Sequence, residues 1–353
     1  MYWVLAILAL GFLIVVHEAG HYFVARWCGM RVERFSLGFG PAIPGLKWKS
    51  KKTGTQFQIA PIPFGGFVEI RGMNIAEEVD PEDKYAYPNR PAWQRFLTIL
   101  AGPATNYLSA IVLAFLLYTC HGVRGDTLYV GVDDVMPGYD AMGKLEPGDR
   151  ITHVDKELLY ATDANERSLT GRVSAKKGAP VVLTVTRDGT SLDVTINPKL
   201  DKNDKGEPIY LLGIHKTIQT DIVSIGVLGA AKRALIYPVE QTKLIVSGLA
   251  DIITGKQDAD PGGPKRILDE FSRHFKAGFV RGIELLMMLS VYLGLFNLFP
   301  LPALDGGRLV FLGYEMITRR RANPKIEAMV HMGGIMVLGV IMILVTLHDF
   351  HVF

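Results

Sequence analysis

Four long segments without lysine or arginine constrain this chain more than any other feature of its sequence. All 38 lysines and arginines lie between Arg26 and Lys325, outside these segments. The segments are residues 1–25, 96–120, 282–304 and 328–348. A helix needs about 20 apolar residues to cross the hydrocarbon core of a bilayer. We therefore expect four transmembrane helices, the third of which breaks at Pro300 and Pro302.

The composition supports a membrane protein. Hydrophobic residues make up 49% of the chain and the mean hydropathy is +0.22, which argues against an ordinary soluble enzyme. A net charge of +3 gives no reason to expect a nucleic-acid partner. A cleaved signal peptide is the alternative interpretation of the first segment. However, the segment lacks a basic start, and its apolar run continues into His17 without a small-residue cleavage site.

The positive charges also predict an orientation. Residues 26–95 carry 11 lysines and arginines and the loop 305–327 carries five, whereas the tail after residue 347 carries none. The positive-inside rule places both charged loops in the cytoplasm. Both termini and residues 121–281 then face the outside, and Cys28 and Cys120 lie at opposite faces, too far apart for a disulfide.

The first apolar segment contains the sequence His17-Glu18-Ala-Gly-His21. Residues four apart share one face of a helix, so both imidazoles can bind the same metal ion. Zinc suits two histidines and one carboxylate with a fourth position open for water, and Glu18 can take a proton from that water. Ionisable residues are costly inside a membrane, which favours a functional role for all three.

Such a site needs a third ligand, for which Asp305 is the strongest candidate. It stands in the sequence Asn297-Leu-Phe-Pro-Leu-Pro-Ala-Leu-Asp-Gly-Gly, where the prolines break a helix and the glycines permit tight turns. The motif can also be a simple loop at the end of the third span. Rival ligands are Glu284, at the outer end of its helix, and His331, which we expect to be a packing residue.

These motifs, with Gly102-Pro103-Ala-Thr-Asn106 in the second span, resemble the site-2 proteases, in particular the bacterial RseP-like branch. These are membrane-embedded zinc metalloproteases, and the resemblance covers almost the whole chain. It implies that His17, His21 and Asp305 bind one zinc ion, that Glu18 is the general base, and that Asn297 helps to hold the substrate or the site. The supporting motif residues are Gly102, Pro103, Asn106, Pro300, Pro302, Gly306 and Gly307. The motif predicts no role for Arg308, where relatives often have histidine.

Residues 26–95 are expected to form a β-rich loop on the cytoplasmic side. A hairpin turn is predicted at residues 51–54, and a proline favours an edge strand over residues 62–70. An edge strand near the metal can capture an unwound substrate by strand addition, as the resemblance also suggests. The candidate substrate-binding residues are Ile62, Phe64, Gly65, Gly66 and Phe67. The alternative is a hairpin that only packs on the core.

Residues 121–200 show strand-like runs at 128–132, 181–189 and 192–196. The sequence Leu145-Glu-Pro-Gly-Asp-Arg-Ile151, which lies between them, is similar to the core of bacterial PDZ domains. The following turn, Val154-Asp-Lys156, departs from the PDZ pattern. Such a domain can bind a peptide end, exclude bulky substrates, or serve as a spacer. Residues 201–281 are expected to be helical, with an amphipathic interfacial helix over 222–253, because five charges there argue against a span.

The expected fold is thus an α-helical integral membrane protein with a cytoplasmic-side β-sheet and an extracytoplasmic α+β PDZ domain. The resemblance implies a multi-pass protein of the bacterial inner membrane that cleaves single-span membrane proteins already trimmed by another protease. Anti-sigma factors or signal-peptide remnants are the expected substrates, and the lipid bilayer and a PDZ ligand the other partners. The alternatives are a catalytically inactive PDZ scaffold and, more weakly, a metal transporter.

Overall fold

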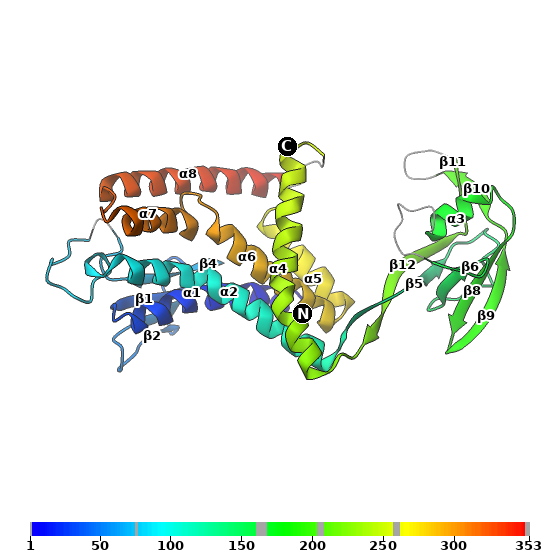
Figure 1. Ribbon diagram of the computed structural model, residues 1–353, viewed down its shortest axis with the longest axis horizontal. Coiled ribbons are helices and arrows are strands. Elements are labelled where there is room, and N and C mark those ends of the chain that lie inside the picture. Colours follow the sequence, from blue (N-terminus) through cyan, green and yellow to red (C-terminus); the bar gives the residue numbers. More distant parts are fainter. Residues whose placement is uncertain (1, 75–76, 160–167, 203–207, 257–261, 350–353) are drawn as a thin grey trace. The chain divides into compact units, whose positions relative to one another are not determined.

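The computed structural model describes residues 2–74, 77–159, 168–202, 208–256 and 262–349 (Figure 1). The chain divides into two compact units. One, called the helical unit below, comprises residues 1–120 and 226–353. The other, called the sheet unit, comprises residues 121–225.

The helical unit contains the four predicted spans. In the described part of the chain, four helices are long and apolar enough to cross a membrane: α1 (Tyr2–Trp27), α2 (Ala92–Cys120), α6 (Phe279–Leu298) and α8 (Pro324–Asp349, apolar to Leu347). The prediction of four spans is confirmed. The two cysteines are free, as expected.

The third span differs in detail from the prediction. Helix α6 ends at Leu298, and Phe299 is extended with φ −63° and ψ 142°. The residue before a proline is driven out of the helical region, and Pro300 follows Phe299. The break was expected, but the span was expected to reach residue 304. The segment 305–327 was expected to be a loop, whereas its first part is a helix, α7 (Asp305–Thr318).

Small residues let the helices approach closely. A β-carbon added at Gly20 of α1 would lie 2.3 Å from the Ala101 carbonyl oxygen of α2. One added at Gly294 of α6 would lie 2.6 Å from the ring of Tyr107 on α2. Helices in lipid associate through such close packing, because lipid provides no hydrophobic drive between them. Helix α2 therefore lies between α1 and α6 and contacts both.

Two further helices complete the unit: α4 (Gly226–Ile253) and α5 (Pro264–Ala277). Helix α4 packs on α2 and α6, and α5 packs on α1 and α6. Neither is among the candidate spans found in the described residues, in agreement with the expectation from the charges of α4. The helical prediction for 201–281 therefore holds for its second half.

A four-stranded sheet follows α1, with strand order β2-β3-β1-β4. Its strands are β1 (Val32–Phe39), β2 (Lys47–Lys49), β3 (Gln56–Ile59) and β4 (Ile62–Ile70). Strands β2 and β3 form the predicted antiparallel hairpin. Strand β4 pairs only with β1, so it is an edge strand of this sheet, as the proline suggested. It also packs against α1. A short 3-10 helix (Tyr87–Asn89) leads into α2.

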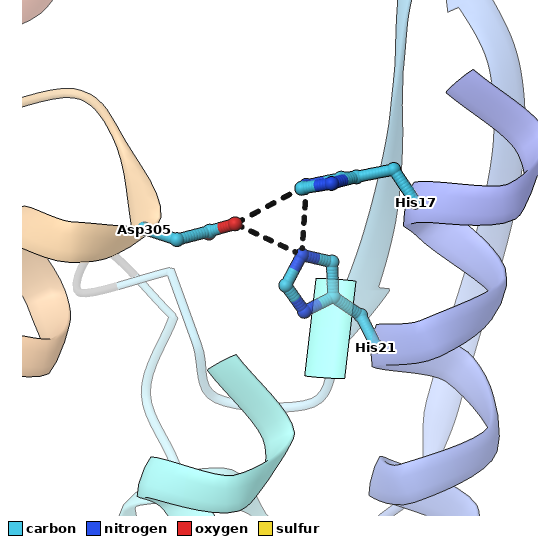
Figure 2. A group of neighbouring side chains, drawn as sticks. All are labelled: His17, His21 and Asp305. Carbon is cyan, nitrogen blue, oxygen red and sulfur yellow. Dashed lines mark hydrogen bonds and ion pairs between the residues drawn. The ribbon is translucent and has the colours of Figure 1, made fainter. Parts of the chain in front are cut away.

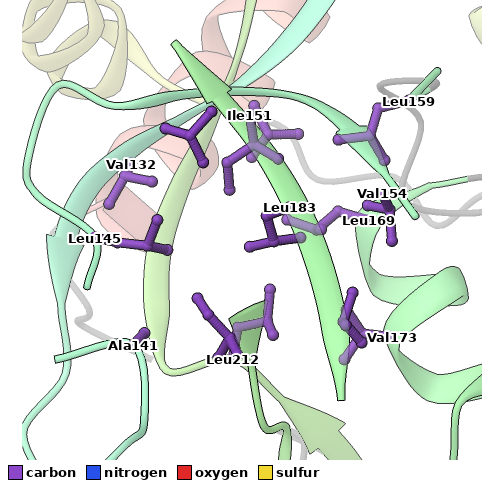
Figure 3. Packing of buried hydrophobic residues seen from close by; sticks show 14 residues of the cluster. Val132, Ala141, Leu145, Ile151, Val154, Leu159, Leu169, Val173, Leu183 and Leu212 are labelled. Atoms are coloured by element: carbon purple, nitrogen blue, oxygen red, sulfur yellow. The ribbon is translucent and has the colours of Figure 1, made fainter. Parts of the chain in front are cut away.

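The sheet unit is built on strands in the order β12-β5-β6-β8-β9, with β7 paired to β6. Its elements are β5 (Val123–Val135), β6 (Arg150–Val154), β7 (Glu157–Leu158), α3 (Leu169–Ala175), β8 (Val181–Arg187), β9 (Thr190–Ile196), β10 (Lys199–Lys202), β11 (Pro208–Leu211) and β12 (Ile214–Val223). A cluster of buried aliphatic residues forms its core (Figure 3).

The boundary predicted for this domain was wrong. The expected domain ended at residue 200, and residues 201–225 were assigned to a helical region. Strand β12 instead pairs antiparallel with β5 along almost its whole length, from Ile214 opposite Val135 to Val223 opposite Val123. The unit therefore extends to residue 225. Sequence periodicity missed β12 because its partner strand lies about 80 to 100 residues earlier in the chain.

Candidate metal centre

Three side chains from two distant parts of the chain meet inside the helical unit (Figure 2). His17 and His21 lie one turn apart on α1, and Asp305 is the first residue of α7. Asp305 Oδ2 lies 3.1 Å from His17 Nε2 and 3.3 Å from His21 Nε2. The two imidazole Nε2 atoms are 3.2 Å apart. In the described residues, this is the group of histidine and acidic side chains placed to hold a metal ion.

The three distances fit a tetrahedral zinc ion. Ligand atoms at about 2.0 to 2.1 Å from zinc lie roughly 3.3 Å apart along the edges of a tetrahedron. The observed separations are 3.1, 3.2 and 3.3 Å. Asp305 Oδ2 is buried and has no hydrogen-bond donor in the described part of the protein. Two imidazoles and an orphaned carboxylate oxygen thus form a donor set suited to zinc.

Helix α2 orients both histidines. His21 Nδ1 donates a hydrogen bond to the Thr98 carbonyl at 2.8 Å, which leaves the Nε2 lone pair facing Asp305. The Asn106 side-chain nitrogen lies 3.1 Å from His17 Nδ1, and the Asn106 Oδ1 is buried with no hydrogen-bond partner among the described residues. Rotation of that amide presents Oδ1 as an acceptor for His17 Nδ1. Partners of this kind fix the ring orientation of metal-binding histidines.

The glycine of the Gly102-Pro103 motif makes room for the imidazoles. A β-carbon at Gly102 would lie 2.3 Å from His21 Nε2 and 2.9 Å from His17 Cε1. Nearby, the Thr105 hydroxyl donates to the Val16 carbonyl at 2.9 Å. Thr98, Gly102 and Asn106 are spaced by four residues, so they line one face of α2. That face packs directly on the two histidines.

The glycines after Asp305 allow α7 to begin against the preceding loop. A β-carbon at Gly306 would lie 2.0 Å from the Phe299 carbonyl oxygen, and one at Gly307 would lie 2.5 Å from that of Leu301. No side chain fits at either position. Farther along α7, Glu315 accepts a hydrogen bond from Arg95 of α2, which is only 5% exposed. This buried ion pair ties the helix that carries Asp305 to the helix that orients the histidines.

The three donor atoms face a cavity of about 840 Å³. Glu18 lines the same cavity and interacts electrostatically with His17, His21 and Asp305. Strand β4 forms another wall through residues 66–70. A β-carbon at Gly66 would lie 3.2 Å from Glu18 Cγ, so the edge strand runs directly beside the acid of the motif. The cavity therefore joins a metal-ligand set, a candidate general base and an edge strand.

Only some of the other predicted site residues line the cavity. Asn297 lines the cavity, with its amide donating to the Leu293 carbonyl at 2.9 Å. Gly66 and Phe67 also line it. Ile62 and Gly65 do not, and Ile62 is 51% exposed. The side chain of Phe64 lies outside the described residues.

Of the two rival ligands, neither belongs to the metal-ligand group. Glu284 forms an ion pair with Arg281 at 3.6 Å, one turn away on α6. His331 lines the cavity, but its Nδ1 accepts a hydrogen bond from the Ala303 amide at 3.2 Å. Its placement agrees with the expected packing role and brings it to the wall of the site.

Sequence reasoning missed residues that orient the histidines or line the cavity. Thr98 acts through its backbone carbonyl, which no side-chain pattern can reveal. The spacing of Thr98, Gly102 and Asn106 by four was a usable signal. The cavity uses the second half of β4, whereas the prediction emphasised its first half. Arg308 also lines the cavity, three residues after Asp305.

The fold and the site together define a class of protein: a membrane-spanning helical bundle with a metal-ligand set and an acidic residue in one internal cavity. Comparison with known proteins makes the class specific. Residues 5–343 match Peptidase family M50. The chain therefore belongs to peptidase family M50 and is a zinc metalloprotease, with zinc as its cofactor.

Similar proteins occur in several bacteria. The chain is 31% identical to the putative zinc metalloprotease mll0638 of Mesorhizobium japonicum, with 92% of each chain covered. It is 32% identical to the putative zinc metalloprotease RC0203 of Rickettsia conorii, with 96% of each covered. It is 30% identical to the putative zinc metalloprotease CA_C1796 of Clostridium acetobutylicum, covering 98% of this chain and 96% of the relative. The relationship therefore spans both units.

Proposed function

We propose that the protein is an intramembrane zinc endopeptidase in which His17, His21 and Asp305 hold one zinc ion and Glu18 is the general base. The observation that carries this proposal is the triangle of donor atoms, 3.1 to 3.3 Å on each side, on a helix of transmembrane length. Glu18 follows His17 on α1 and lines the same cavity as the three donors.

The roles of the chain's own residues follow from this arrangement. When bound, zinc lowers the pKa of a coordinated water and polarises the scissile carbonyl. Glu18 accepts the proton of the attacking water and returns it to the leaving amine. Thr98 and Asn106 keep the two imidazoles turned towards the metal. Asn297, on the cavity wall, is proposed to hold the substrate or the site.

Strand β4 is proposed to present the substrate to this machinery. The backbone of a transmembrane helix is fully hydrogen-bonded, so a peptide bond must be unwound before it can be attacked. The edge of β4 opposite β1 pairs with no other described strand, and it offers backbone partners to an extended segment by strand addition. Its cavity-lining part, residues 66–70, runs beside Glu18, which supports the delivery of the segment to the site.

We further propose that the protein resides in the bacterial inner membrane with both termini and the sheet unit outside the cytoplasm. The distribution of lysine and arginine in the short loops supports this orientation, with Arg319, Arg320 and Arg321 following α7. The substrates would be single-span membrane proteins, of the anti-sigma-factor or signal-peptide-remnant type, already shortened by another protease.

The sheet unit is proposed to be a PDZ domain. Strands β5, β8 and β9 occur where the sequence predicted strands, and Asp149 of the PDZ-like motif pairs with Arg187 of β8 at 2.7 Å. A groove of about 150 Å³ lies between α3 and the β11–β12 region. Such a domain can bind a peptide end or exclude substrates with bulky ectodomains, and cleavage assays with tagged substrates separate the two roles.

The central test compares wild type with Glu18→Gln and Glu284→Gln in detergent, measuring bound zinc and cleavage of a single-span substrate. Glu284 is a matched control, since it is an acid at the start of a span that takes no part in the metal-ligand group. Glu18→Gln is expected to keep zinc and to lose roughly 10² to 10⁴-fold in rate. Glu284→Gln is expected to keep both.

Two outcomes would contradict this proposal. Cleavage by Glu18→Gln at the wild-type rate would remove Glu18 from the mechanism. Wild-type protein that holds zinc but cuts none of several single-span substrates would favour the inactive scaffold or the metal transporter.

A further inference from the structure

His331 connects α8 to the loop that precedes Asp305. Its Nδ1 accepts a hydrogen bond from the Ala303 amide at 3.2 Å. Its ring lies against the start of α7, because a β-carbon at Gly307 would be 3.2 Å from His331 Cε1. The ring of Phe311, one turn farther along α7, has its centre 6.0 Å away. His331 therefore touches the two segments that flank Asp305 in the chain.

The backbone at Ala303 is strained. Its φ is +79°, in the left-handed region that residues other than glycine rarely adopt. Neighbouring turns account for other loop amides, with Leu301 donating to Phe299 and Leu304 donating to Leu301. The Ala303 amide instead donates to His331. A side chain from another helix thus holds the strained residue located two positions before Asp305.

The hydrogen bond also fixes the form of the imidazole. Because Nδ1 accepts a hydrogen bond from the Ala303 amide, the ring proton of the neutral imidazole lies on Nε2. Nε2 is buried and has no partner among the described residues. The contribution of the side chain to the loop is therefore a single acceptor atom, at the position of Nδ1.

Helix α8 contacts the same loop at a second point. A β-carbon at Gly334 would lie 2.3 Å from Pro302 Cβ, so the helix backbone packs directly on that proline. Residues 331 and 334 are three apart and share one face of α8. The rest of α8 is mostly exposed, and only 6% of its most apolar stretch is buried. This face is where α8 meets the loop that precedes Asp305.

We propose that His331 is a positioning residue: by accepting the Ala303 amide at Nδ1, it holds the strained loop in the conformation that directs the Asp305 carboxylate at His17 and His21. The inference rests on the proposed role of Asp305 as a zinc ligand. It predicts that zinc affinity depends on an acceptor atom on α8, which lies outside the ligand set.

Three substitutions in the full-length protein test the position of that atom. Asparagine places an amide oxygen where Nδ1 lies, glutamine places it farther out near Nε2, and leucine offers no acceptor. Zinc affinity is measured by competition with a chromophoric chelator. His331→Leu and His331→Gln are expected to lose about 10 to 100-fold in affinity, the usual effect of removing an outer-shell partner. His331→Asn is expected to stay within roughly threefold of wild type.

A second-site variant separates positioning from general damage to α8. Ala303→Gly removes the penalty for positive φ, so the loop needs less support. Added to His331→Leu, it is expected to restore a large part of the lost zinc affinity, while alone it should leave affinity unchanged. Circular dichroism confirms that each variant is folded.

The inference is overturned if His331→Leu binds zinc as tightly as wild type. It is also overturned if a folded His331→Asn is as weak as His331→Leu, or if Ala303→Gly rescues nothing. Asp305→Ala tests the underlying ligand assignment separately. If Asp305→Ala retains wild-type zinc affinity, the proposed ligand set fails regardless of the result at His331.

Discussion

The core of the sheet unit and the surroundings of the metal centre bury different mixtures of residues. The core of the sheet unit is a cluster of 14 buried residues, all aliphatic, such as Ile151, Leu183 and Ile196 (Figure 3). In the helical unit, the buried positions near the site also include polar or very small residues, namely His21, Thr98, Gly102 and Asn106, beside apolar ones such as Ile70 and Ile99. Its large hydrophobic residues are often exposed, as expected of a surface that faces lipid.

The difference reflects the solvent of each unit. Water drives aliphatic side chains into a common core, at roughly 25 cal/mol per Å² of buried apolar area. Lipid supplies no such drive, so helices are held by close backbone approach and by hydrogen bonds between them. The same polar contacts that join α1 to α2 also orient the metal ligands. Stability and chemistry therefore share residues in the helical unit, and the predictions below test whether they are separate in the sheet unit.

The largest expected effect is on the sheet-unit core. Leu183 of β8 is fully buried. Leu183→Ala is expected to lower the free energy of unfolding of this unit by about 2 to 5 kcal/mol, through lost burial and a cavity. Hydrogen exchange of the β8 and β9 amides in urea, in the full-length protein, measures the change. Leu158→Ala, at a half-exposed position of β7, is the matched control.

The loss of stability in Leu183→Ala should leave the zinc affinity of the protein unchanged. Leu183→Ala is expected to bind zinc with wild-type affinity, since the proposed ligands all lie in the helical unit. A parallel fall in zinc affinity would show that the metal centre depends on the sheet-unit core and would contradict the comparison.

The reciprocal change is Gly102→Ala in the helical unit. The new β-carbon would lie 2.3 Å from His21 Nε2, so the imidazoles must move. The expected result is a loss of about 10 to 100-fold in zinc affinity, measured by chelator competition, as for other changes around metal ligands. Gly11→Ala on α1 is the control, because no atom lies within 4 Å of its added β-carbon. Unchanged affinity in Gly102→Ala would show that α2 does not constrain the ligands.

The two units also differ in what the sequence could reveal. In the helical unit, the length of the segments without lysine or arginine predicted the spans, and helical spacing predicted that His17 and His21 share one face. Asp305 was one of several candidates for the third ligand, and the resemblance to the site-2 proteases implied it. These signals are local or chemically rare. The role of Thr98 was invisible because it acts through a carbonyl, and α7 was taken as a loop because only its charges were considered.

In the sheet unit, strands with clear alternation were predicted, whereas β12 was not. Its isoleucines at 214, 218 and 222 recur every four residues, which does not distinguish strand from helix. Pairing with the distant β5 determines its structure. On β4 the candidate substrate-binding residues ran from Ile62 to Phe67, and the cavity is lined by Gly66, Phe67 and the three residues that follow.

The smallest expected effect concerns a polar group in the sheet unit, where the comparison predicts a purely structural role. Asp149 is 1% exposed and accepts hydrogen bonds from Arg187 and from the Glu146 amide. Burial raises the pKa of Asp149, but the hydrogen bonds from Arg187 and from that amide outweigh it, so the pKa lies below its ordinary value. The pair therefore stabilises the unit above the ordinary pKa of about 3.9, and this contribution is lost as pH falls through the lower folded value.

Asp149→Asn should abolish this acid-dependent step and destabilise the sheet unit at neutral pH by about 1 kcal/mol, the net value of a typical hydrogen bond. Hydrogen exchange of the β6 and β8 amides between neutral and acid pH, corrected for intrinsic rates, measures both effects. Glu157→Gln is the control, because the Glu157 side chain is 75% exposed and its ion pair with Arg172 contributes little. An acid step that survives in Asp149→Asn would assign it to another carboxylate. If Asp149→Asn changed the zinc affinity at neutral pH, a polar group of the sheet unit would also support the metal centre. That result would contradict the proposed separation of stability and chemistry in the sheet unit.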